Sequence, residues 1–219
     1  MAKSDLSFIF GGNTTMKRYE CMKALASSVR EDDLVVTNLG NTMHEWLSVR
    51  PSRANLYNMN LGQCTPVALG LALALPNRRV IALDGDGNLL MNLASLADVA
   101  YHKPRNLKIM VFDNQAYESP GGMPTATAHG VDLAEIAKGC TITNSHTVSR
   151  IEDFKSKLNL IDQNELLFLT AKIEMGTIER GQYAALDYKY NKYIFATYIE
   201  ETEKKPVLRL RSKSPFTEK

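Results

Sequence analysis

The chain has 219 residues, enough for one large α/β domain and too few for two of usual size. Its hydrophobic content of 44% is ordinary for a globular protein, and a net charge of +2 gives no strong field for nucleic acid. The three cysteines lie far apart without Cys-x-x-Cys spacing, which argues against zinc or iron–sulfur ligation. No secretory signal or membrane-length apolar run is evident, so we expect a cytoplasmic protein without a membrane or nucleic-acid partner.

Hydrophobic periodicity predicts strands that alternate with helices along most of the chain. The predicted helices cover residues 17–30, a stretch through Trp46 and Leu47, and residues 65–75, 89–101, 132–138, 148–160 and 195–203. The predicted strands cover residues 34–37, 55–58, 79–83, 107–112, 141–143 and 166–173. Continuous apolar strands such as RVIAL and LKIMVF are typical of a parallel sheet covered on both faces. We therefore predict a single α/β domain over residues 17–204, an N-terminal arm at 1–16 and a basic C-terminal tail at 205–219.

Three loops at predicted strand ends carry unusual polar residues, at 38–44, 84–88 and 113–124. In open parallel sheets, ligands bind at the carboxyl ends of the strands. In the second loop, Gly85, Asp86 and Gly87 stand between a buried strand and a helix. Glycines and a helix start favour a bound anion, but an aspartate would repel phosphate unless a Mg²⁺ ion lies between them. A purely structural Asp-Gly turn is the alternative.

The third loop follows the next buried strand and begins Asp113-Asn114-Gln115-Ala116. In a parallel sheet this strand end can lie beside the end that carries Asp86. The amide oxygen of Asn114 and the carbonyl of Ala116 can then join Asp86 on one metal ion. An asparagine that only caps the strand end is the alternative.

Gly-Asp-Gly, a helix, a strand and then Asn114, twenty-eight positions after Asp86, resemble the signature of thiamine-diphosphate enzymes. The stretches ALDGDGNLLMNLASLADVA and IMVFDNQAYESPGGMPT are similar to the diphosphate-binding domain of the phosphonopyruvate and sulfopyruvate decarboxylase group. The resemblance implies Mg²⁺ bound by Asp86, Asn114 and the Ala116 carbonyl. Asp113, where many relatives have asparagine, departs from the pattern beside a ligand. The resemblance also implies a wider set of residues that bind thiamine diphosphate: Asn41, Thr42, Met59, Leu61, Gly85, Asp86, Gly87, Asn88, Asn114, Ala116 and Tyr117.

Met59-Asn60-Leu61-Gly62 stands where relatives carry Gly-Ser-Met-Gly. By that match, Leu61 is the apolar wedge between the two rings of the cofactor, and the Met59 carbonyl accepts a hydrogen bond from the pyrimidine amine. A plain core leucine is the alternative. Asn41 and Thr42, which follow Gly40, correspond to a Gly-x-Thr motif that relatives carry next to the diphosphate. Both residues are also suited to capping a helix.

Relatives that act on phosphonates or sulfonates tend to show Ser-Arg-Glu-Leu or Ser-Lys-Glu-Leu, where this chain has Met43-His44-Glu45-Trp46. A histidine titrates near neutrality, so it binds a dianion less strongly than a permanent cation does. We therefore expect a substrate without a phosphonate or sulfonate group. His44 is either a proton carrier near the substrate or a surface histidine. Glu118 is either an acid in the site or a solvated loop residue.

The resemblance implies decarboxylation of a small 2-oxo acid, with an activating glutamate from a separate pyrimidine-binding domain. This chain has no length for that domain, so we expect a second, alpha-type subunit to supply it. A hetero-oligomer with at least two copies of each chain follows, and the tyrosine-rich stretch 183–198 offers surface for the contact. The alternatives are a carboligating or oxidoreductase subunit with the same cofactor, and a cofactor-free regulatory module of the same fold.

Overall fold

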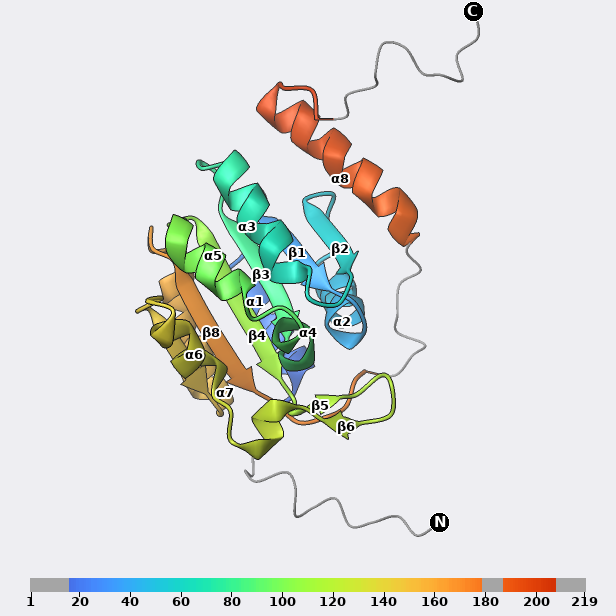
Figure 1. Ribbon diagram of the computed structural model, residues 1–219. Coiled ribbons are helices and arrows are strands. Elements are labelled where there is room, and N and C mark those ends of the chain that lie inside the picture. Colours follow the sequence, from blue (N-terminus) through green and yellow to red (C-terminus); the bar gives the residue numbers. More distant parts are fainter. Residues whose placement is uncertain (1–15, 179–186, 208–219) are drawn as a thin grey trace, which may run out of the picture.

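The computed structural model describes residues 16–178 and 187–207, which form a parallel sheet with helices on both faces (Figure 1). Its six strands have the order β2-β1-β3-β4-β8-β7, which confirms the predicted fold class. The strands are β1 (Leu34–Asn38), β2 (Asn55–Met59), β3 (Val80–Gly85), β4 (Leu107–Asp113), β7 (Ser145–Val148) and β8 (Leu167–Lys172), with a separate hairpin of β5 (Ala116–Tyr117) and β6 (Met123–Pro124). The α-helices are α1 (Arg18–Ala26), α2 (Asn41–Val49), α3 (Cys64–Ala74), α4 (Asp86–Leu90), α5 (Ser95–His102), α6 (Leu133–Gly139), α7 (Ile151–Lys157) and α8 (Tyr188–Glu203), and the 3-10 helices are η2 (Ala126–His129) and η3 (Leu158–Asp162).

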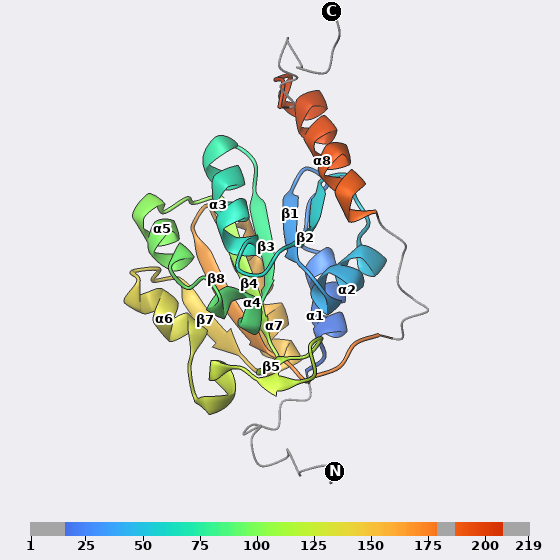
Figure 2. The same ribbon diagram turned by 45° about the vertical axis from the view of Figure 1, so that its right-hand side comes forward.

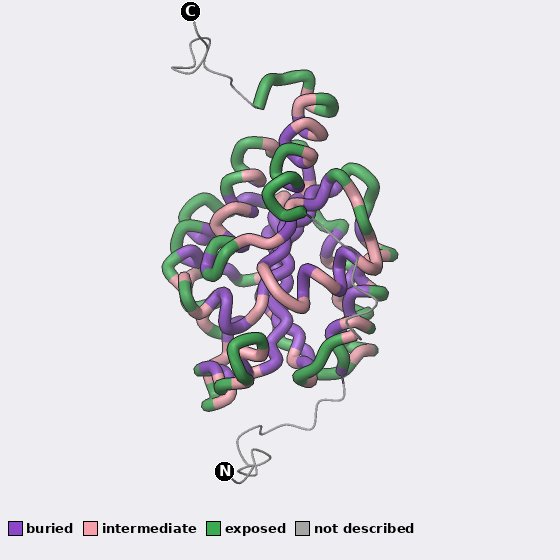
Figure 3. Tube along the Cα trace, turned by 90° about the vertical axis from the view of Figure 1, so that its right-hand side faces the viewer, coloured by how far each residue is buried: buried purple, intermediate pink, exposed green. Residues whose placement is uncertain are grey.

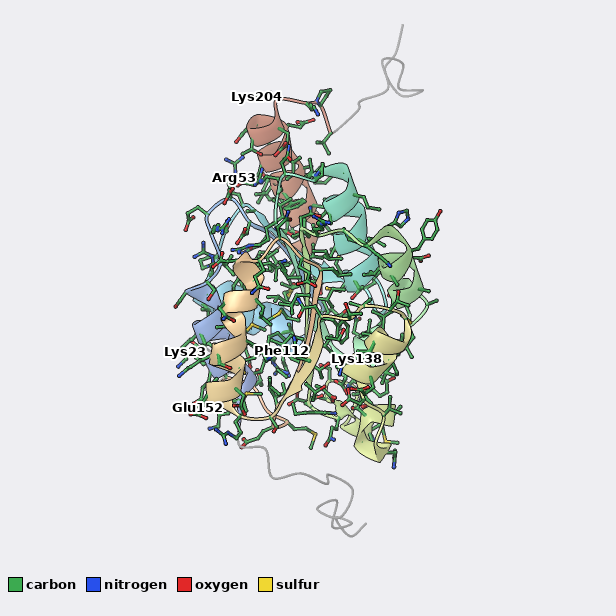
Figure 4. All side chains as sticks on the ribbon, turned by 90° about the vertical axis from the view of Figure 1, so that its left-hand side faces the viewer. Lys23, Arg53, Phe112, Lys138, Glu152 and Lys204 are labelled. Carbon is green, nitrogen blue, oxygen red and sulfur yellow. The ribbon has the colours of Figure 1, made fainter. Side chains whose placement is uncertain are left out.

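Alternate strand residues pack on opposite faces of the sheet, so each face has its own apolar layer. On β4, Ile109 and Val111 join the layer that includes residues of α3, α5 and α6. Met110 and Phe112 join the layer that includes residues of α1, α2 and α7. Phe112 lies in the interior of the molecule (Figure 4), and burial is concentrated along the sheet (Figure 3). Since both faces are covered, β4 carries apolar residues on both of its faces.

Helix α8 packs against the edge strand β2, as Figure 1 shows. The side chain of Asp187 caps this helix by accepting hydrogen bonds from the backbone N–H groups of Lys189, at 2.9 Å, and Tyr190, at 3.1 Å. Buried Asn191 accepts from the Tyr57 N–H at 2.9 Å and donates to the Asn55 carbonyl at 3.1 Å. Its amide thereby satisfies the hydrogen-bonding capacity of two backbone groups on the edge strand. No described helix is long and apolar enough to cross a membrane.

Several element boundaries differ from the prediction. The predicted helix 89–101 is two helices, α4 and α5, separated by turns over residues 91–94. The predicted strand 141–143 is wrong, because Thr141 has a left-handed φ of 71° and the strand forms at β7. Helix α7 therefore begins three residues later than predicted, and α8 begins seven residues earlier. The predicted arm, except Met16, and the tail beyond residue 207 lie outside the described residues.

The carboxyl ends of β1, β3 and β4 point to one end of the sheet. Helices α2 and α4 begin there, and the β5–β6 hairpin lies at the same end (Figure 2). In the parallel register of β3 and β4, Gly85 pairs with Phe112. Asp86 directly follows Gly85 in the chain and Asp113 directly follows Phe112, so Asp86 and Asp113 are brought close together.

Candidate active site

The turn from β3 into α4 is built around Asp84, which is 1% exposed. Its carboxylate accepts hydrogen bonds from the Thr65 hydroxyl at 2.8 Å, from the Gly85 N–H at 2.9 Å and from the Asn88 amide. Burial raises the pKa of Asp84 to about 6, although these hydrogen bonds act in the opposite direction. Asp84 thus holds the turn that presents Asp86, a role that the sequence prediction missed.

Asp86 is the first residue of α4, and only 2% of it is exposed. Its Oδ2 accepts hydrogen bonds from the hydroxyls of Thr125, at 2.6 Å, and Thr127, at 3.3 Å. Burial and the neighbouring charge of Asp113 raise the pKa of Asp86 to about 7. The two hydroxyl groups are neutral donors, so they solvate the carboxylate without cancelling its charge.

The third loop brings Asn114 and Ala116 to the same place. Gln115 between them has a left-handed φ of 61°, which closes a tight turn. The Ala116 N–H donates to Asn114 Oδ1 at 3.2 Å. A Cβ at Gly87 would lie 2.5 Å from the Tyr117 ring, so only glycine allows α4 to approach this loop so closely.

One pocket is lined by residues of all three loops. Gly40, with a φ of 82°, begins the turn into α2, and Asn41 and Thr42 are the first residues of that helix. Leu61 also lines the pocket and is 47% exposed. Met59 and His44 are not among the described lining residues. The lining residues are Arg18, Asn38, Leu39, Gly40, Asn41, Thr42, Leu61, Gly85, Asp86, Gly87, Asn88, Phe112, Asn114, Ala116, Tyr117, Glu118, Ser119 and Pro120.

The exposed position of Leu61 is fixed by the neighbouring Gly62, which has a left-handed φ of 74°. The Gly62 N–H donates to Asn88 Oδ1 at 3.0 Å, and the Gly62 carbonyl accepts from the Asn92 amide at 2.9 Å. Helix α4 and the turn after it therefore clamp the loop that carries Leu61. The side chain of Asn88, predicted to bind cofactor, is engaged with this loop and with Asp84.

The pocket contains donors of the kind that Mg²⁺ prefers, which are carboxylate, amide and carbonyl oxygens. Asp86, Asn114 and Ala116 each line it and are each at most 6% exposed. A divalent cation there would offset the unfavourable burial of the Asp86 charge, so the residues present fit the predicted ion. Residues 37–169 match the family model described as thiamine pyrophosphate enzyme, C-terminal TPP binding domain. The chain belongs to this family. Thiamine pyrophosphate is another name for thiamine diphosphate, so the predicted family is confirmed.

Proteins similar to this chain include one that is named as a subunit and one that is much longer than this chain. The β subunit of sulfopyruvate decarboxylase from Methanocaldococcus jannaschii is 37% identical over 147 residues, or 65% of this chain and 78% of the relative. Phosphonopyruvate decarboxylase from Streptomyces viridochromogenes is 33% identical over 64% of this chain, which spans only 35% of that relative. Among solved structures, 4-hydroxybenzoylformate decarboxylase from Rhodococcus jostii has a TM-score of 0.62 and 19% identity, covering 76% of this chain and 34% of that one. This structural likeness shows the shared fold.

Asp113 is one of the positions at which the sequence departs from the pattern of the family that it resembles. The side chain is fully buried, and its Oδ2 lies 2.5 Å from the ammonium group of Lys172 on β8. Its Oδ1 accepts from the Thr127 hydroxyl at 2.7 Å and from the Gln115 N–H at 3.0 Å. Lys172 therefore neutralises a second carboxylate beside the one predicted to bind metal.

Arg18 on α1 is a pocket residue that the sequence prediction missed, because its main partner is 27 positions away. Its guanidinium lies 3.0 Å from the Glu45 carboxylate and 3.8 Å from that of Glu118. Arg18 and Glu45 are 5% and 1% exposed. The positive charge is thus already balanced by carboxylates within the chain.

His44 lies on α2, outside the lining of the pocket that the described residues form. Its ring packs edge-on against Tyr188 at the start of α8, with centroids 6.5 Å apart. Partial burial lowers the pKa of His44, which favours the neutral ring at physiological pH.

Proposed function

We propose that this chain is the diphosphate-binding subunit of a two-subunit 2-oxo acid decarboxylase that requires thiamine diphosphate and Mg²⁺. The observation that carries the proposal is the convergence of Asp86, Asn114 and Ala116 in the pocket that also contains Leu61. The family match supports the cofactor, and the decarboxylase names of its relatives support the reaction class. Bound cofactor supplies a nucleophilic carbon and an electron sink for cleavage next to a carbonyl.

The chain's own residues bind and orient. Asp86, Asn114 and the Ala116 carbonyl would hold Mg²⁺, whose charge would neutralise the diphosphate. Asn41 and Thr42, the first residues of α2, line the same pocket, and the start of a helix favours a bound anion. Leu61 would be the apolar wedge between the two rings of the bound cofactor, and the Met59 carbonyl would accept a hydrogen bond from the pyrimidine amine. Such positioning can lower a barrier by several kcal/mol.

A partner subunit supplies the activating glutamate. This chain spans 78% of a sulfopyruvate decarboxylase β subunit but only 35% of the sulfopyruvate decarboxylase of Methanosarcina acetivorans. Leu61 is exposed at the mouth of the pocket, where a wedge has a purpose only if another surface holds the pyrimidine. We propose a hetero-oligomer with at least two copies of each chain, because cofactor sites of this kind form between domains.

The substrate that we propose is a 2-oxo acid without a phosphonate or sulfonate group. His44 stands where a permanent cation is expected for such groups, and the charge of Arg18 is already balanced by Glu45 and Glu118. A panel of 2-oxo acids tested on the assembled complex checks the point. Faster turnover of sulfopyruvate or phosphonopyruvate than of 2-oxo acids without a second anionic group would contradict it.

The deciding experiment compares the isolated chain with the chain assembled with the product of the neighbouring gene. Each is saturated with Mg²⁺ and thiamine diphosphate, and CO₂ release from 2-oxo acids is followed. We expect turnover only from the assembled complex, whose mass in solution gives the copy number. Robust turnover by the isolated chain would refute the two-subunit arrangement. A complex that binds the cofactor but releases no CO₂ would refute the decarboxylase assignment.

A further inference from the structure

Glu118 occupies a defined place beside the predicted metal ligands. Its side chain is only 22% exposed, although it lies in the turn of the β5–β6 hairpin. Oε2 accepts a hydrogen bond from Asn114 Nδ2 at 3.0 Å, and Oε1 accepts from the Gly176 N–H at 2.7 Å. Both carboxylate oxygens therefore have donors, and Glu118 is neither a solvated loop residue nor a free acid.

The contacts with Glu118 and with the Ala116 N–H together set which way the Asn114 amide faces. An ionised carboxylate only accepts hydrogen bonds, so it selects the NH₂ end of the amide. The other end, Oδ1, accepts from the Ala116 N–H at 3.2 Å and keeps a second lone pair for a metal ion. A reversed amide would direct two N–H groups toward the cation and repel it.

Glu118 is itself held from two other parts of the chain. The Gly176 N–H belongs to the segment after β8, and Arg18 on α1 lies 3.8 Å from Oε2. Arg18 is fixed in turn by Glu45 on α2, at 3.0 Å, and by the Gly176 carbonyl, at 2.8 Å. None of the proposed metal ligands lies on α1 or α2. The orientation of Asn114 therefore depends, through Arg18 and Glu118, on the packing of α1 against α2.

We propose that Glu118 is a positioning residue that orients the Asn114 amide with its oxygen toward Mg²⁺. The inference rests on the proposed function, because it needs Asn114 to be a metal ligand. Outer contacts of this kind typically change metal affinity by about 10- to 100-fold when they are removed.

The first test is Glu118→Gln in the full chain assembled with its partner subunit. The glutamine has one acceptor oxygen, and the Gly176 N–H at 2.7 Å favours that oxygen, so its NH₂ group faces Asn114. In its present orientation the Asn114 amide then meets a donor instead of an acceptor, and a reversed amide would meet the Ala116 N–H, so matched partners no longer hold its oxygen toward Mg²⁺. We expect Mg²⁺ affinity, measured by calorimetry with thiamine diphosphate present, to fall about tenfold or more. Glu174→Gln, which removes the same charge two residues from Gly176, should leave the affinity within about twofold.

The second test is the exchange of the two groups, Asn114→Asp with Glu118→Gln. It keeps the net charge and restores a donor–acceptor pair, because the new amide donates to the new carboxylate. Asn114→Asp alone places two carboxylates at about the 3.0 Å now seen between Asn114 Nδ2 and Glu118 Oε2. We therefore expect Glu118→Gln to weaken Mg²⁺ binding in the natural chain and to strengthen it in the Asn114→Asp background.

A change of sign between the two backgrounds is something that a merely structural role would not produce. Melting temperatures without ligand report folding separately, and the isosteric exchange remains informative if the single variant is unstable. An equal loss in both backgrounds, or no loss in the natural chain, would overturn the role of Glu118. If the natural complex binds no thiamine diphosphate with Mg²⁺, the proposed function itself fails.

Discussion

The two ends of the sheet hold some of their buried carboxylates in opposite ways, whereas Asp113 at the carboxyl end is paired with Lys172. At the amino ends of the strands, Asp33 lies 2.5 Å from the guanidinium of Arg79, which also lies 2.8 Å from Asp162. Hydrogen bonding to Arg79 lowers the pKa of Asp162. At the carboxyl ends, the donors that hold Asp84 and Asp86 are hydroxyl, amide and N–H groups. Burial raises the pKa of these two carboxyl groups to about 6 and about 7.

The difference separates stability from binding. A carboxylate paired with an arginine has its charge balanced within the chain, so it holds elements together and attracts little else. A buried carboxylate among neutral donors keeps an uncompensated charge, which a divalent cation can neutralise. The same residue type therefore serves architecture at one end and ligand binding at the other.

The largest expected effect is at the carboxyl end. Asp86→Ala removes the only charged group of the proposed metal site, so Mg²⁺-dependent binding of thiamine diphosphate should weaken by at least about 100-fold. Calorimetry with and without Mg²⁺ measures this. Asn114→Ala is the graded comparison and should act less strongly, because water can replace a neutral ligand. An unchanged cofactor affinity in Asp86→Ala would remove the metal assignment.

At the amino end, the expected loss is in folding alone. Arg79→Met leaves Asp33, whose side chain is 2% exposed, without its guanidinium partner. We expect the free energy of unfolding to fall by about 3–5 kcal/mol. Urea denaturation measures this, while the Mg²⁺ affinity of the folded protein should stay the same. A tenfold change in that affinity would show that the two ends are coupled.

A pH-dependent effect sharpens the comparison in the absence of metal and cofactor. The folded-state pKa of Asp86, about 7, lies above its unfolded value of about 3.9, so the folded state holds an extra proton between them. This contribution to stability is lost as the pH rises from about 4 to 7. Asp86→Asn should therefore unfold like the natural chain near pH 4 but be more stable by on the order of 2 kcal/mol at pH 8. Equal stability at both pH values would contradict the burial argument.

The smallest expected effect concerns an exposed pair of the amino end. Arg30 and Asp162 lie 2.6 Å apart, but their side chains are 59% and 58% exposed. Water and salt screen such a pair, so Arg30→Ala should change the free energy of unfolding by less than about 0.5 kcal/mol. A loss comparable to that of Arg79→Met would mean that Asp162 depends on both arginines.

The sequence could predict what is carried by local pattern. Continuous apolar runs identified β3 and β4, and the order of strands in a parallel sheet brought the loops at Asp86 and Asn114 together. The true start of α8 was missed because it depends on the cap at Asp187, outside the apolar pattern. The predicted strand at 141–143 failed because the left-handed Thr141 ends the turn after α6 instead.

Long-range partners were beyond local pattern. Thr125 and Thr127 follow the glycine-rich loop and look like ordinary loop residues, yet their hydroxyls contact Asp86 across 39 and 41 positions. The pairing of Arg18 with Glu45 depends on how α1 packs on α2, which no spacing in the sequence encodes. These contacts are set by tertiary packing, so only a three-dimensional structure reveals them.

The pairing of Asp113 with Lys172 has an evolutionary consequence. The two residues are 59 positions apart in the chain but are neighbours across β4 and β8. Replacing Lys172 first would leave a buried carboxylate beside Asp86, whereas replacing Asp113 by asparagine first would remove the reason to keep a lysine. The order of substitutions therefore matters, and we expect strong epistasis between the two sites. A pairwise mutational scan should find Lys172→Met tolerated in an Asp113→Asn background and selected against in the natural one.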